Sequence, residues 1–458
     1  MSTLTPSLSL LAQAVGAPLP TRETRFTRIV IDSRQVQPGD LFVALTGGQQ
    51  DGHRFIQAAA AAGAAGALVQ QPQALDLPQV VVPDTVAALQ RWGAACREAF
   101  THPVIGVTGS NGKTTTKQLL AAVCGLRGAV LATEGNLNNH LGVPLTLTRL
   151  RDQHETAIIE MGANHIGEIA QLSAWARPQI GVVTQAGDAH LEGFGSREGI
   201  ARGKGELFAS LGPRGVAIIN ADDVFAPLWR ELAGPASQIQ FGYSCRADVQ
   251  AVEVELDATR TSFMLVTPEG SARVRLPMPG AHNVMNALAA AASACALGMA
   301  VDDIARGLAG VELAAGRLKV LTGVGGVCVA DDSYNANPTS MRAGLDWLSR
   351  QPGRRWAVLG HMAELGADSV ALHRAIGAYA AEHGIERCIA VGAAARGVAE
   401  GFGRDAEWLP DTAAAIQALG VPGPDVTVLV KGSRSARMEQ VVAALTGAPI
   451  NGVQEGVH

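Results

Sequence analysis

A glycine-rich stretch near residue 110 contains the residue types that hold a phosphate group. It reads Thr108-Gly109-Ser110-Asn111-Gly112-Lys113-Thr114-Thr115, and it joins an apolar, β-branched run to a helix-forming segment. In such loops the backbone N–H groups and the helix N-terminus face the phosphates, the lysine reaches the β- and γ-phosphates, and the adjacent hydroxyl binds Mg²⁺. Val107 replaces the usual first glycine, and Gly109 makes the turn instead. We therefore predict a site for a nucleoside triphosphate with Mg²⁺.

Three ionisable residues stand at corresponding places around this loop. Glu160 ends an apolar run, His190 lies in a glycine-containing loop after the next apolar run, and Lys204 lies on the helix that follows. A carboxylate that ends a buried strand beside a phosphate loop can bind Mg²⁺ or polarise a water molecule. Singly, these residues could be an ion-pair partner, a capped loop histidine and a solvated lysine. Their common placement favours a metal–nucleotide site.

The elements around these residues predict a doubly wound α/β domain. Residues 103–108, 156–160 and 179–184 read as buried strands, each followed by a helical stretch, so ligands should lie at the carboxyl ends of a parallel sheet. An amide-rich loop over residues 134–144 contains Asn138 and Asn139, which suit a sugar or a peptide backbone. Asn283 opens an alanine-rich helix, where it could contact a base or ribose or simply cap the helix.

The segment before residue 100 reads as a smaller α/β unit. Strands near residues 28–31 and 40–45 alternate with alanine-rich helices. Polar turns follow these strands and contain Ser33, Arg34, Thr46 and Gly47. These turns could hold a diphosphate, and solvated turns would explain them equally well.

A third unit begins near Gly316-Arg317 and predicts a second open α/β sheet. Strands are expected at residues 327–330, 356–359, 388–391 and 426–430. Polar loops over residues 331–338, 360–366 and 431–434 follow three of them, and they should form one ligand-binding face because strand ends meet at one sheet edge. We therefore predict three domains, with boundaries at 1–100, 101–315 and 316–458.

The totals exclude several classes of protein. The 458 residues carry 36 basic and 41 acidic side chains, and the net charge of −5 argues against a nucleic-acid or anionic-membrane binder. The six cysteines are scattered without C-x-x-C pairs, so we expect buried thiols in a reducing compartment. The first 20 residues lack the features of a signal peptide, and the alanine-rich run 56–69 is too short to span a bilayer. The expected location is the cytoplasm.

Taken in order, these segments resemble the Mur ligase family. The resemblance rests on the phosphate loop, the 135–144 loop, Glu160, His190, residues 204–206, residues 282–286, Gly316-Arg317 and residues 331–338. It covers essentially the whole chain. Within the family, the Asp-Ser-Tyr-Asn-Ala-Asn-Pro string at residues 332–338 is most similar to the members that use D-alanyl-D-alanine.

The resemblance implies an ATP-dependent ligase of cytoplasmic peptidoglycan precursor synthesis. Such an enzyme phosphorylates the terminal carboxylate of a UDP-muramoyl tripeptide and couples the resulting acyl phosphate to D-alanyl-D-alanine, releasing ADP and phosphate. Its domains would be a small UDP-substrate-binding domain, a central P-loop ATPase domain and a C-terminal Rossmann-like domain. We expect ATP and two Mg²⁺ ions as cofactors, and a monomer.

The resemblance also implies a role for each candidate residue. The catalytic set would be Lys113, Glu160, His190, Lys204 and Arg317. Thr114, Glu160, His190 and a carbamylated Lys204 would hold the metals. The phosphate loop would bind ATP together with Asn283 near the adenine, Arg317 on the γ-phosphate and Asp332 on the ribose. The remaining substrate contacts would come from Ser33, Arg34, Thr46, Gly47, Asn138, Asn139, Asn335 and Asn337.

Two positions depart from the family pattern. His361 stands where aspartate is usual, so the role of its loop is open. Gly203 stands where alanine is commoner, and with Gly199 and Gly205 it places three glycines in one short helix, at about 1 kcal/mol each. Either this helix packs very closely against its neighbours or it begins irregularly.

Two other functions remain open at this stage. One is a different ligase on the same scaffold, either another Mur ligase or an enzyme resembling folylpolyglutamate synthase. The other is an ATP-gated binding or switch protein, which would need only the phosphate loop and a group that positions water.

Overall fold

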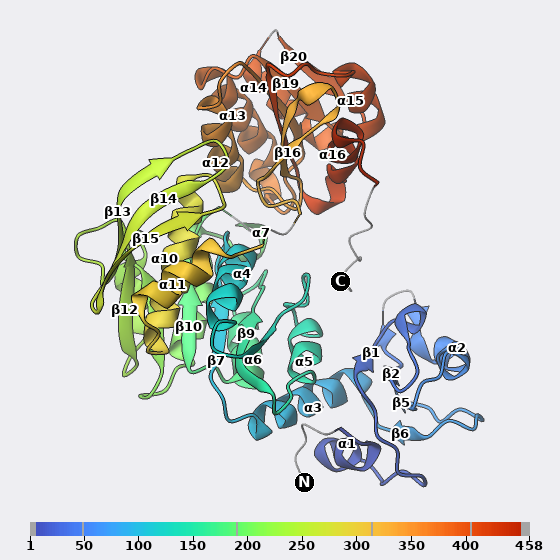
Figure 1. Ribbon diagram of the computed structural model, residues 1–458. Coiled ribbons are helices and arrows are strands. Elements are labelled where there is room, and N and C mark those ends of the chain that lie inside the picture. Colours follow the sequence, from blue (N-terminus) through green and yellow to red (C-terminus); the bar gives the residue numbers. More distant parts are fainter. Residues whose placement is uncertain (1–5, 48–49, 189–190, 313–314, 404, 450–458) are drawn as a thin grey trace.

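The computed structural model describes residues 6–47, 50–188, 191–312, 315–403 and 405–449. These residues form a four-stranded sheet near the N-terminus, a nine-stranded central sheet and a six-stranded sheet near the C-terminus, besides a short two-stranded hairpin. The sheets follow one another along the molecule (Figure 1). No described helix is long and apolar enough to cross a membrane.

The N-terminal sheet has the strand order β1-β2-β5-β6, with every neighbouring pair parallel. Its strands are β1 (Ile29–Val30), β2 (Leu41–Val43), β5 (Gly66–Val69) and β6 (Gln79–Val81), and the hairpin comprises β3 (Thr46–Gly47) and β4 (Gln50–Asp51). The helical elements are α1 (Leu8–Val15), η1 (Ser33–Gln35), η2 (Gly52–Phe55), α2 (Ile56–Ala61) and α3 (Thr85–Ala99).

Helix α3 attaches this small sheet to the central part of the chain. Buried Trp92 shares a core cluster with Leu141 and Leu145 of the central part. A Cβ at Gly93 would lie 2.9 Å from the Cα of Pro144. Helix α3 and the helix that contains Pro144 therefore pack with their backbones in close contact. The buried Arg97 guanidinium donates hydrogen bonds to the carbonyl oxygens of Phe100, Ala176 and Arg177.

The central sheet has the order β15-β14-β13-β12-β11-β10-β7-β9-β8. It is parallel from β8 to β13, and β14 and β15 extend it as antiparallel strands. The strands are β7 (Val104–Thr108), β8 (Ala129–Ala132), β9 (His154–Glu160), β10 (Ile180–Val183), β11 (Val216–Asn220), β12 (Ser237–Gly242), β13 (Val249–Leu256), β14 (Thr261–Thr267) and β15 (Gly270–Leu276).

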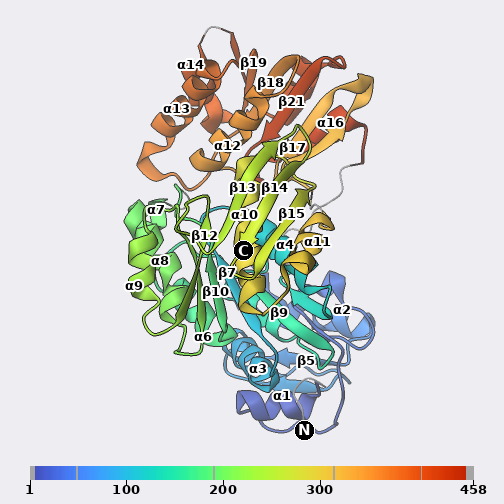
Figure 2. The same ribbon diagram turned by 60° about the vertical axis from the view of Figure 1, so that its left-hand side comes forward.

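Helices cover both faces of this sheet (Figures 1 and 2). One apolar core lies under α4 (Lys113–Cys124), α10 (Ala281–Ala296) and α11 (Val301–Ala309). The other lies under α5 (Gly142–Leu147), α6 (Glu168–Ala176), α7 (Leu191–Phe194), α8 (Arg197–Ala209) and α9 (Ala226–Leu232). The predicted doubly wound domain is confirmed, although buried helix α5 begins inside the stretch expected to be a loop.

The C-terminal sheet has the order β16-β17-β21-β18-β19-β20, parallel except for β16. Its strands are β16 (Lys319–Thr322), β17 (Cys328–Asp332), β18 (Arg354–Gly360), β19 (Arg387–Val391), β20 (Ala406–Leu409) and β21 (Val426–Lys431). Its helical elements are η3 (Val324–Gly326), α12 (Pro338–Ser349), η4 (Gly366–Asp368), α13 (Ser369–Glu382), η5 (Ala393–Ala395), α14 (Arg396–Phe402), α15 (Thr412–Leu419), η6 (Arg434–Ala436) and α16 (Glu439–Thr446).

The three polar loops of this domain lie at one edge of the sheet, as predicted. They follow β17, β18 and β21, which are adjacent strands with parallel pairing. The expectation for the cysteines was only partly right. All six are free, but only Cys96, Cys124 and Cys388 are buried, and Cys245 is exposed.

Candidate active site

The phosphate loop connects β7 to α4 and depends on two glycines. Gly109 has φ 144°, and a Cβ there would lie 1.9 Å from Thr184 Oγ1. Gly112 has φ 81°, and its Cβ would lie 2.1 Å from Asn286 Oδ1. Only glycine fits either position, because both the backbone conformation and the available space exclude a side chain. The turn predicted at Gly109 is therefore required by its surroundings.

Lys113 is the first residue of α4 and folds back over the loop. Its Nζ donates a hydrogen bond to the Gly109 carbonyl oxygen at 2.7 Å. Burial lowers the pKa of Lys113, while the nearby Glu160 carboxylate opposes that shift. The lysine therefore lies at the loop, where it can exchange this carbonyl for a phosphate oxygen.

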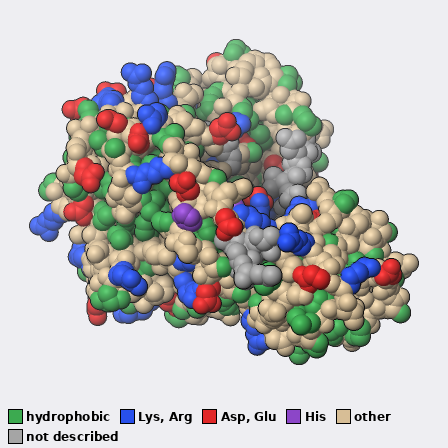
Figure 3. Space-filling model, turned by 60° about the horizontal axis from the view of Figure 1, so that its bottom comes forward, with side chains coloured by type: hydrophobic (Ala, Val, Ile, Leu, Met, Phe, Trp, Pro, Cys, Tyr) green, Lys and Arg blue, Asp and Glu red, His purple; other side chains and the backbone are tan. Residues whose placement is uncertain are grey.

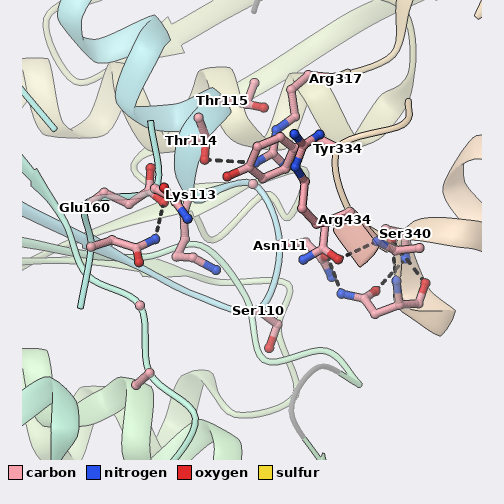
Figure 4. Close-up of a pocket in the computed structure, with 18 of the residues that line it drawn as sticks. Ser110, Asn111, Lys113, Thr114, Thr115, Glu160, Arg317, Tyr334, Ser340 and Arg434 are labelled. Atoms are coloured by element: carbon pink, nitrogen blue, oxygen red, sulfur yellow. Dashed lines mark hydrogen bonds between the residues drawn. The ribbon is translucent and has the colours of Figure 1, made fainter. Parts of the chain in front are cut away.

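Arg317 brings the C-terminal domain to the phosphate loop (Figure 4). Its guanidinium lies 4.0 Å from the Tyr334 ring centroid, and Nη2 donates a hydrogen bond to Thr114 Oγ1 at 3.1 Å. A second contact between the C-terminal domain and the phosphate loop is the hydrogen bond that Asn337 Nδ2 donates to Asn111 Oδ1 at 2.7 Å. Residues more than 200 positions apart thus meet around one loop.

Glu160 ends β9, the strand beside β7, and is almost completely buried. Asn138 Nδ2 donates a hydrogen bond to its Oε1 at 2.8 Å, and Oε2 lies 3.1 Å from buried Lys117 Nζ. Burial alone would raise the pKa of Glu160, but the charges of Lys117 and Lys113 and the Asn138 hydrogen bond lower it overall. The carboxylate is therefore ionised. Sequence reasoning missed Lys117, although it lies one helical turn after Lys113 on α4.

The donor set at this point is suited to Mg²⁺. Apart from the ion pair with Lys117, Glu160 Oε2 has no hydrogen-bond partner among the described residues, so it keeps a lone pair for a cation. Thr114 Oγ1 is a second hard oxygen that lines the same cavity. No described group of three or more His, Cys, Asp or Glu residues could hold a metal ion. Two oxygen donors suit Mg²⁺, which takes much of its coordination from phosphates and water.

Lys204 on α8 is completely buried, whereas a lysine on a helix is usually exposed to solvent. Its Nζ donates a hydrogen bond to the Ala163 carbonyl oxygen at 2.8 Å and lies 4.9 Å from the Phe194 ring centroid. Burial, with a smaller contribution from Lys113, lowers the pKa of Lys204 well below its ordinary value. Burial therefore makes this amine easier to deprotonate than an ordinary lysine.

The glycines of α8 are explained by close packing. The helix is regular over Arg197–Ala209. A Cβ at Gly199 would lie 2.2 Å from the Phe194 carbonyl oxygen, one at Gly203 would lie 2.4 Å from the Phe194 ring, and one at Gly205 would lie 2.4 Å from Leu232. The close packing that glycine permits at these three positions outweighs its unfavourable helix propensity.

We expect Gly203→Ala to destabilise the protein by about 1–3 kcal/mol, since the added methyl group overpacks buried Phe194. The gain of about 1 kcal/mol in helix propensity would offset only part of that loss. Urea unfolding measures the change. Gly212→Ala is the control, because nothing lies within 4 Å of its Cβ position. Equal stability of the two variants would contradict the packing argument.

The cavity at this site has a volume of about 660 Å³ and lies between the central and C-terminal domains. That volume is in the range of small-molecule sites. Most of the candidate residues line it: Ser110, Asn111, Gly112, Lys113, Thr114, Thr115, Asn138, Asn139, Glu160, Asn283, Arg317, Asp332, Asn335 and Asn337. His190 lies outside the described residues.

Several lining residues also have structural partners. Asn139 Oδ1 accepts hydrogen bonds at the start of α5, and Asn337 caps α12. Asn283 Nδ2 donates to the Pro279 carbonyl oxygen. Asp332 Oδ2 lies 2.7 Å from Lys431 Nζ. Their predicted contacts with nucleotide or substrate remain predictions.

The N-terminal turns lie apart from this cavity. Ser33 and Arg34 lie in η1, which follows β1, and Thr46 and Gly47 form β3, which follows β2, so both segments lie at one edge of a parallel sheet. The turn expected at Thr46 and Gly47 is therefore one strand of the short hairpin. Arg34 forms an ion pair with Asp32 at 2.7 Å. Figure 3 shows a hollow between this lobe and the rest of the molecule, with basic side chains at its edge.

Comparisons with known proteins agree with this architecture. Three family models match: "Mur ligase family, catalytic domain" at residues 25–109, "Mur ligase middle domain" at 107–294, and "Mur ligase, glutamate ligase domain" at 316–434. A protein of Escherichia coli (strain K12), named UDP-N-acetylmuramoyl-tripeptide--D-alanyl-D-alanine ligase, is 41% identical over 442 residues, covering 96% of this chain and 98% of the relative. The chain belongs to the Mur ligase family. A Bacillus subtilis (strain 168) ligase of the same name is 35% identical and covers 92% of this chain and 94% of the relative.

Solved structures of Mur ligases extend the comparison. MurF from Acinetobacter baumannii has a TM-score of 0.88 and 39% identity, covering 96% of this chain and 98% of that one. MurF from Thermotoga maritima, solved with ADP, has a TM-score of 0.78 and 27% identity, covering 91% and 96%. A folylpolyglutamate synthase from Mycobacterium tuberculosis has a TM-score of 0.63 at 17% identity, which shows a shared fold alone.

Proposed function

We propose that this protein is the ATP-dependent ligase that joins D-alanyl-D-alanine to UDP-N-acetylmuramoyl-tripeptide and forms ADP. The observation that carries the proposal is the full-length similarity to ligases of that name, together with a phosphate loop that opens into a cavity between two domains. The ADP complex of the Thermotoga maritima relative supports ATP as the nucleotide. The reaction belongs to peptidoglycan precursor synthesis, and the cytoplasm and a monomeric state are part of the proposal.

The reaction proceeds in two transfers. A tripeptide carboxylate oxygen attacks the γ-phosphorus of ATP, and the bond to the β-phosphate oxygen breaks, which leaves an acyl phosphate and ADP. The neutral amine of the dipeptide then attacks the acyl carbon, loses a proton and expels inorganic phosphate. Phosphoryl transfer depends mainly on positioning and charge neutralisation. Lys113 and Arg317 bring two cationic groups to the phosphate loop for that purpose.

Thr114 and Glu160 would hold Mg²⁺, with His190 and a carbamylated Lys204 as further members of a two-metal site. Bound Mg²⁺ neutralises phosphate charge. Glu160 is kept ionised by Lys117 and oriented by Asn138. The proposal places the adenine near Asn283 and the ribose near Asp332.

The remaining candidate residues would hold the peptide-bearing substrate. Ser33, Arg34, Thr46 and Gly47 would bind its UDP end, and Asn138, Asn139, Asn335 and Asn337 its muramoyl-peptide portion. The UDP turns follow two adjacent parallel strands, while the four asparagines line the cavity.

Phosphate release measured with different acceptors tests the proposed function. We expect release only when UDP-muramoyl tripeptide, ATP and D-alanyl-D-alanine are all present, with much weaker release when single amino acids replace the dipeptide. Release with a single amino acid instead would identify another Mur ligase. Release without any acceptor would favour an ATP-driven switch.

A Lys204→Ala variant should lose about 100-fold in ligase activity. Burial lowers the pKa of the Lys204 amine, and in its neutral form this amine can add to CO₂, giving a carbamate and a proton. In the proposal, that change supplies an anion to the metal site. Acetate or formate should restore part of the activity by supplying a carboxylate in the space left by the side chain. Full activity of the variant would contradict the role, as would failure of short carboxylates to rescue a folded, inactive variant.

A further inference from the structure

Arg317, which connects the C-terminal domain to the phosphate loop, lies in a strained turn. Gly316 before it has φ 77°, and Leu318 after it has φ 55°. A positive φ is unfavourable for leucine, so the surrounding structure must hold this turn in its conformation. Leu318 is buried in the C-terminal core, directly before β16. Arg317 therefore extends from a backbone that is anchored on one side by the core.

Asp331 holds the other side of the turn by its backbone. This residue is buried near the end of β17, and its Oδ2 accepts a hydrogen bond from Gly316 N at 2.9 Å. Its Oδ1 accepts from Ser333 N at 3.2 Å and from Ser333 Oγ at 2.6 Å. Asp331 also pairs with Lys319 in the register of β16 and β17, where the turn enters the sheet. One carboxylate thus connects the residue before Arg317 to the loop after β17.

Tyr334 contacts both the backbone and the side chain of this turn. Its N–H donates a hydrogen bond to the Gly316 carbonyl oxygen at 3.2 Å. Its ring stacks against the Arg317 guanidinium (Figure 4), with the ring centroid 4.0 Å from Cζ. Burial raises the pKa of Tyr334, and the charge of Arg317 partly opposes that rise. A guanidinium stacked in this way is held in one plane, with its N–H groups free at the edge.

The edge of the guanidinium faces the centre expected to bind phosphate. Arg317 Nη2 donates to Thr114 Oγ1 at 3.1 Å. Burial lowers the pKa of Lys113, Glu160 opposes that shift, and the positive charge of Arg317 adds to it. The fold therefore holds two cations close enough to repel each other. An anionic phosphoryl group bound between them would relieve that repulsion.

Phosphoryl transfer depends mainly on positioning, so the freedom of this arginine matters. If Thr114 Oγ1 binds Mg²⁺, Arg317 must exchange its contact with Thr114 for a phosphate oxygen. A long side chain on a mobile turn would lose much conformational freedom when it makes that contact. Contacts that fix the turn and the guanidinium plane beforehand reduce this loss.

We propose that Asp331 and Tyr334 are positioning residues for Arg317. Asp331 fixes the turn that carries the arginine, and Tyr334 fixes the plane of its guanidinium, so that Arg317 reaches the γ-phosphate of ATP. This assignment rests on the proposed function, in which Arg317 binds the γ-phosphate. It makes the discrimination between ATP and ADP depend on two residues that act through Arg317.

Nucleotide binding tests the assignment without turnover. Isothermal titration calorimetry in the presence of Mg²⁺ compares ADP with an ATP analogue that has a non-hydrolysable β,γ-imido bridge. Wild-type enzyme should bind the analogue about tenfold more tightly than ADP, because the γ-phosphate gains a charge-assisted contact with Arg317. Arg317→Ala should lose this preference with little change in its affinity for ADP.

Asp331→Ala should lower the preference for the analogue to about two- to threefold, because the guanidinium is then poorly placed. Asp331→Asn should recover part of the preference, since the amide keeps one acceptor oxygen. The double variant Asp331→Ala with Arg317→Ala should bind both nucleotides like Arg317→Ala alone, because no guanidinium is left to position.

Two variants of Tyr334 separate the ring from the hydroxyl group. Tyr334→Phe keeps the ring face against Arg317 and should keep the preference for the analogue. Tyr334→Leu removes the ring face and should lower the preference about threefold. This pair does not alter the buried carboxylate, so it tests the same arginine independently of any loss of stability in Asp331→Ala.

Asp40→Ala is the matched control for the loss of a buried aspartate. Asp40 is also buried, and it accepts a hydrogen bond from Gln37 N in the N-terminal domain, outside the cavity. This variant should be less stable than wild type but should keep the preference for the analogue. Thermal unfolding of each variant shows whether it is folded.

Four outcomes would overturn the assignment. They are equal binding of ADP and the analogue by wild-type enzyme, an unchanged preference in folded Asp331→Ala, equal preferences in Tyr334→Leu and Tyr334→Phe, and a further loss of analogue affinity in the double variant beyond that of Arg317→Ala. If Asp331→Ala did not fold, the Tyr334 pair and Asp331→Asn would decide. Dipeptide-dependent phosphate release by wild-type enzyme would leave the proposed function standing in each case. Its absence would contradict the proposed function, whereas the nucleotide preference could still be measured.

Discussion

Replacing Lys113 with methionine should reduce dipeptide-dependent phosphate release by about 1000-fold or more. Lys113 Nζ already lies at the phosphate loop, on the Gly109 carbonyl oxygen, and its partly buried position strengthens its interaction with a transferring phosphoryl group. Methionine keeps the length and packing of the side chain and removes the charge. The loss should therefore appear mainly in kcat.

The same substitution should leave the fold almost as stable as before. Burial lowers the pKa of Lys113, so the folded protein bears a cost for keeping this ammonium charged. Removing it sacrifices one hydrogen bond and relieves that cost. Lys319→Met on β16 is a matched control outside the cavity and should be fully active. Addition of ADP with Mg²⁺ should raise the melting temperature of wild type and control more than that of Lys113→Met. Activity within tenfold of wild type would contradict the role.

The phosphate loop could be predicted because its chemistry is local. Gly109, Gly112 and Lys113 are close in sequence, and the strand before them and the helix after them are visible as patterns. The strands β7, β9 and β10 could be placed for the same reason, as continuous apolar runs that signal a buried parallel sheet. Their carboxyl ends then placed Glu160 beside the loop before any contact was known.

The partners of these residues could not be predicted, because burial is a tertiary property. Lys117 looks like any helical lysine, yet its side chain lies in the interior against Glu160. Arg317 reaches Thr114 across 203 positions of the chain, and no periodicity encodes that contact. Gly203 is unfavourable for a helix by its type alone, and its reason is tertiary, because Phe194 occupies the space that a methyl group would need.

The antiparallel strands β14 and β15 at the end of the central sheet were not predicted from the sequence, for a different reason. In β14 the residues Thr261, Phe263, Leu265 and Thr267 are buried in strict alternation, which is a usable signal. The intervening Met264 and Val266 are also apolar, and they blur the contrast between the two faces. These strands matter for the site because the turn between β13 and β14 supports the C-terminal domain, where Trp347 Nε1 donates to the Ala258 carbonyl oxygen.

Glu160 and Lys117 form a buried ion pair. A double-mutant cycle can separate its contribution to stability from its contribution to ligase activity. Glu160→Gln should cost about 3 kcal/mol of stability, because it leaves the Lys117 ammonium buried and unpaired. Lys117→Met should cost a similar amount by stranding the carboxylate. The double variant should regain most of the lost stability, since neutral side chains at both positions leave no unpaired charge. Urea unfolding at neutral pH measures all four proteins.

The pH dependence of stability in the same variants independently checks the direction of the Glu160 pKa shift. The pKa of Glu160 is lowered in the folded protein, so its contribution to stability is present above the ordinary value of 4.5 and is lost as the pH falls through the folded pKa. The stability difference between wild type and Glu160→Gln should therefore shrink in acid. A difference that grew as the pH fell would mean that burial, rather than Lys117, controls this carboxylate.

Activity should not follow stability through this cycle. Both Glu160→Gln and the double variant should lose about 100- to 1000-fold in ligase activity, because neither retains the carboxylate expected to hold Mg²⁺. Mn²⁺ binding measured by electron paramagnetic resonance should weaken in the same two proteins, which gives a readout that is independent of turnover. A stable, active double variant would show that the pair is purely structural. A stable, inactive one would show that the buried lysine serves to keep a metal ligand charged at a buried position, where a neutral side chain would be equally stable.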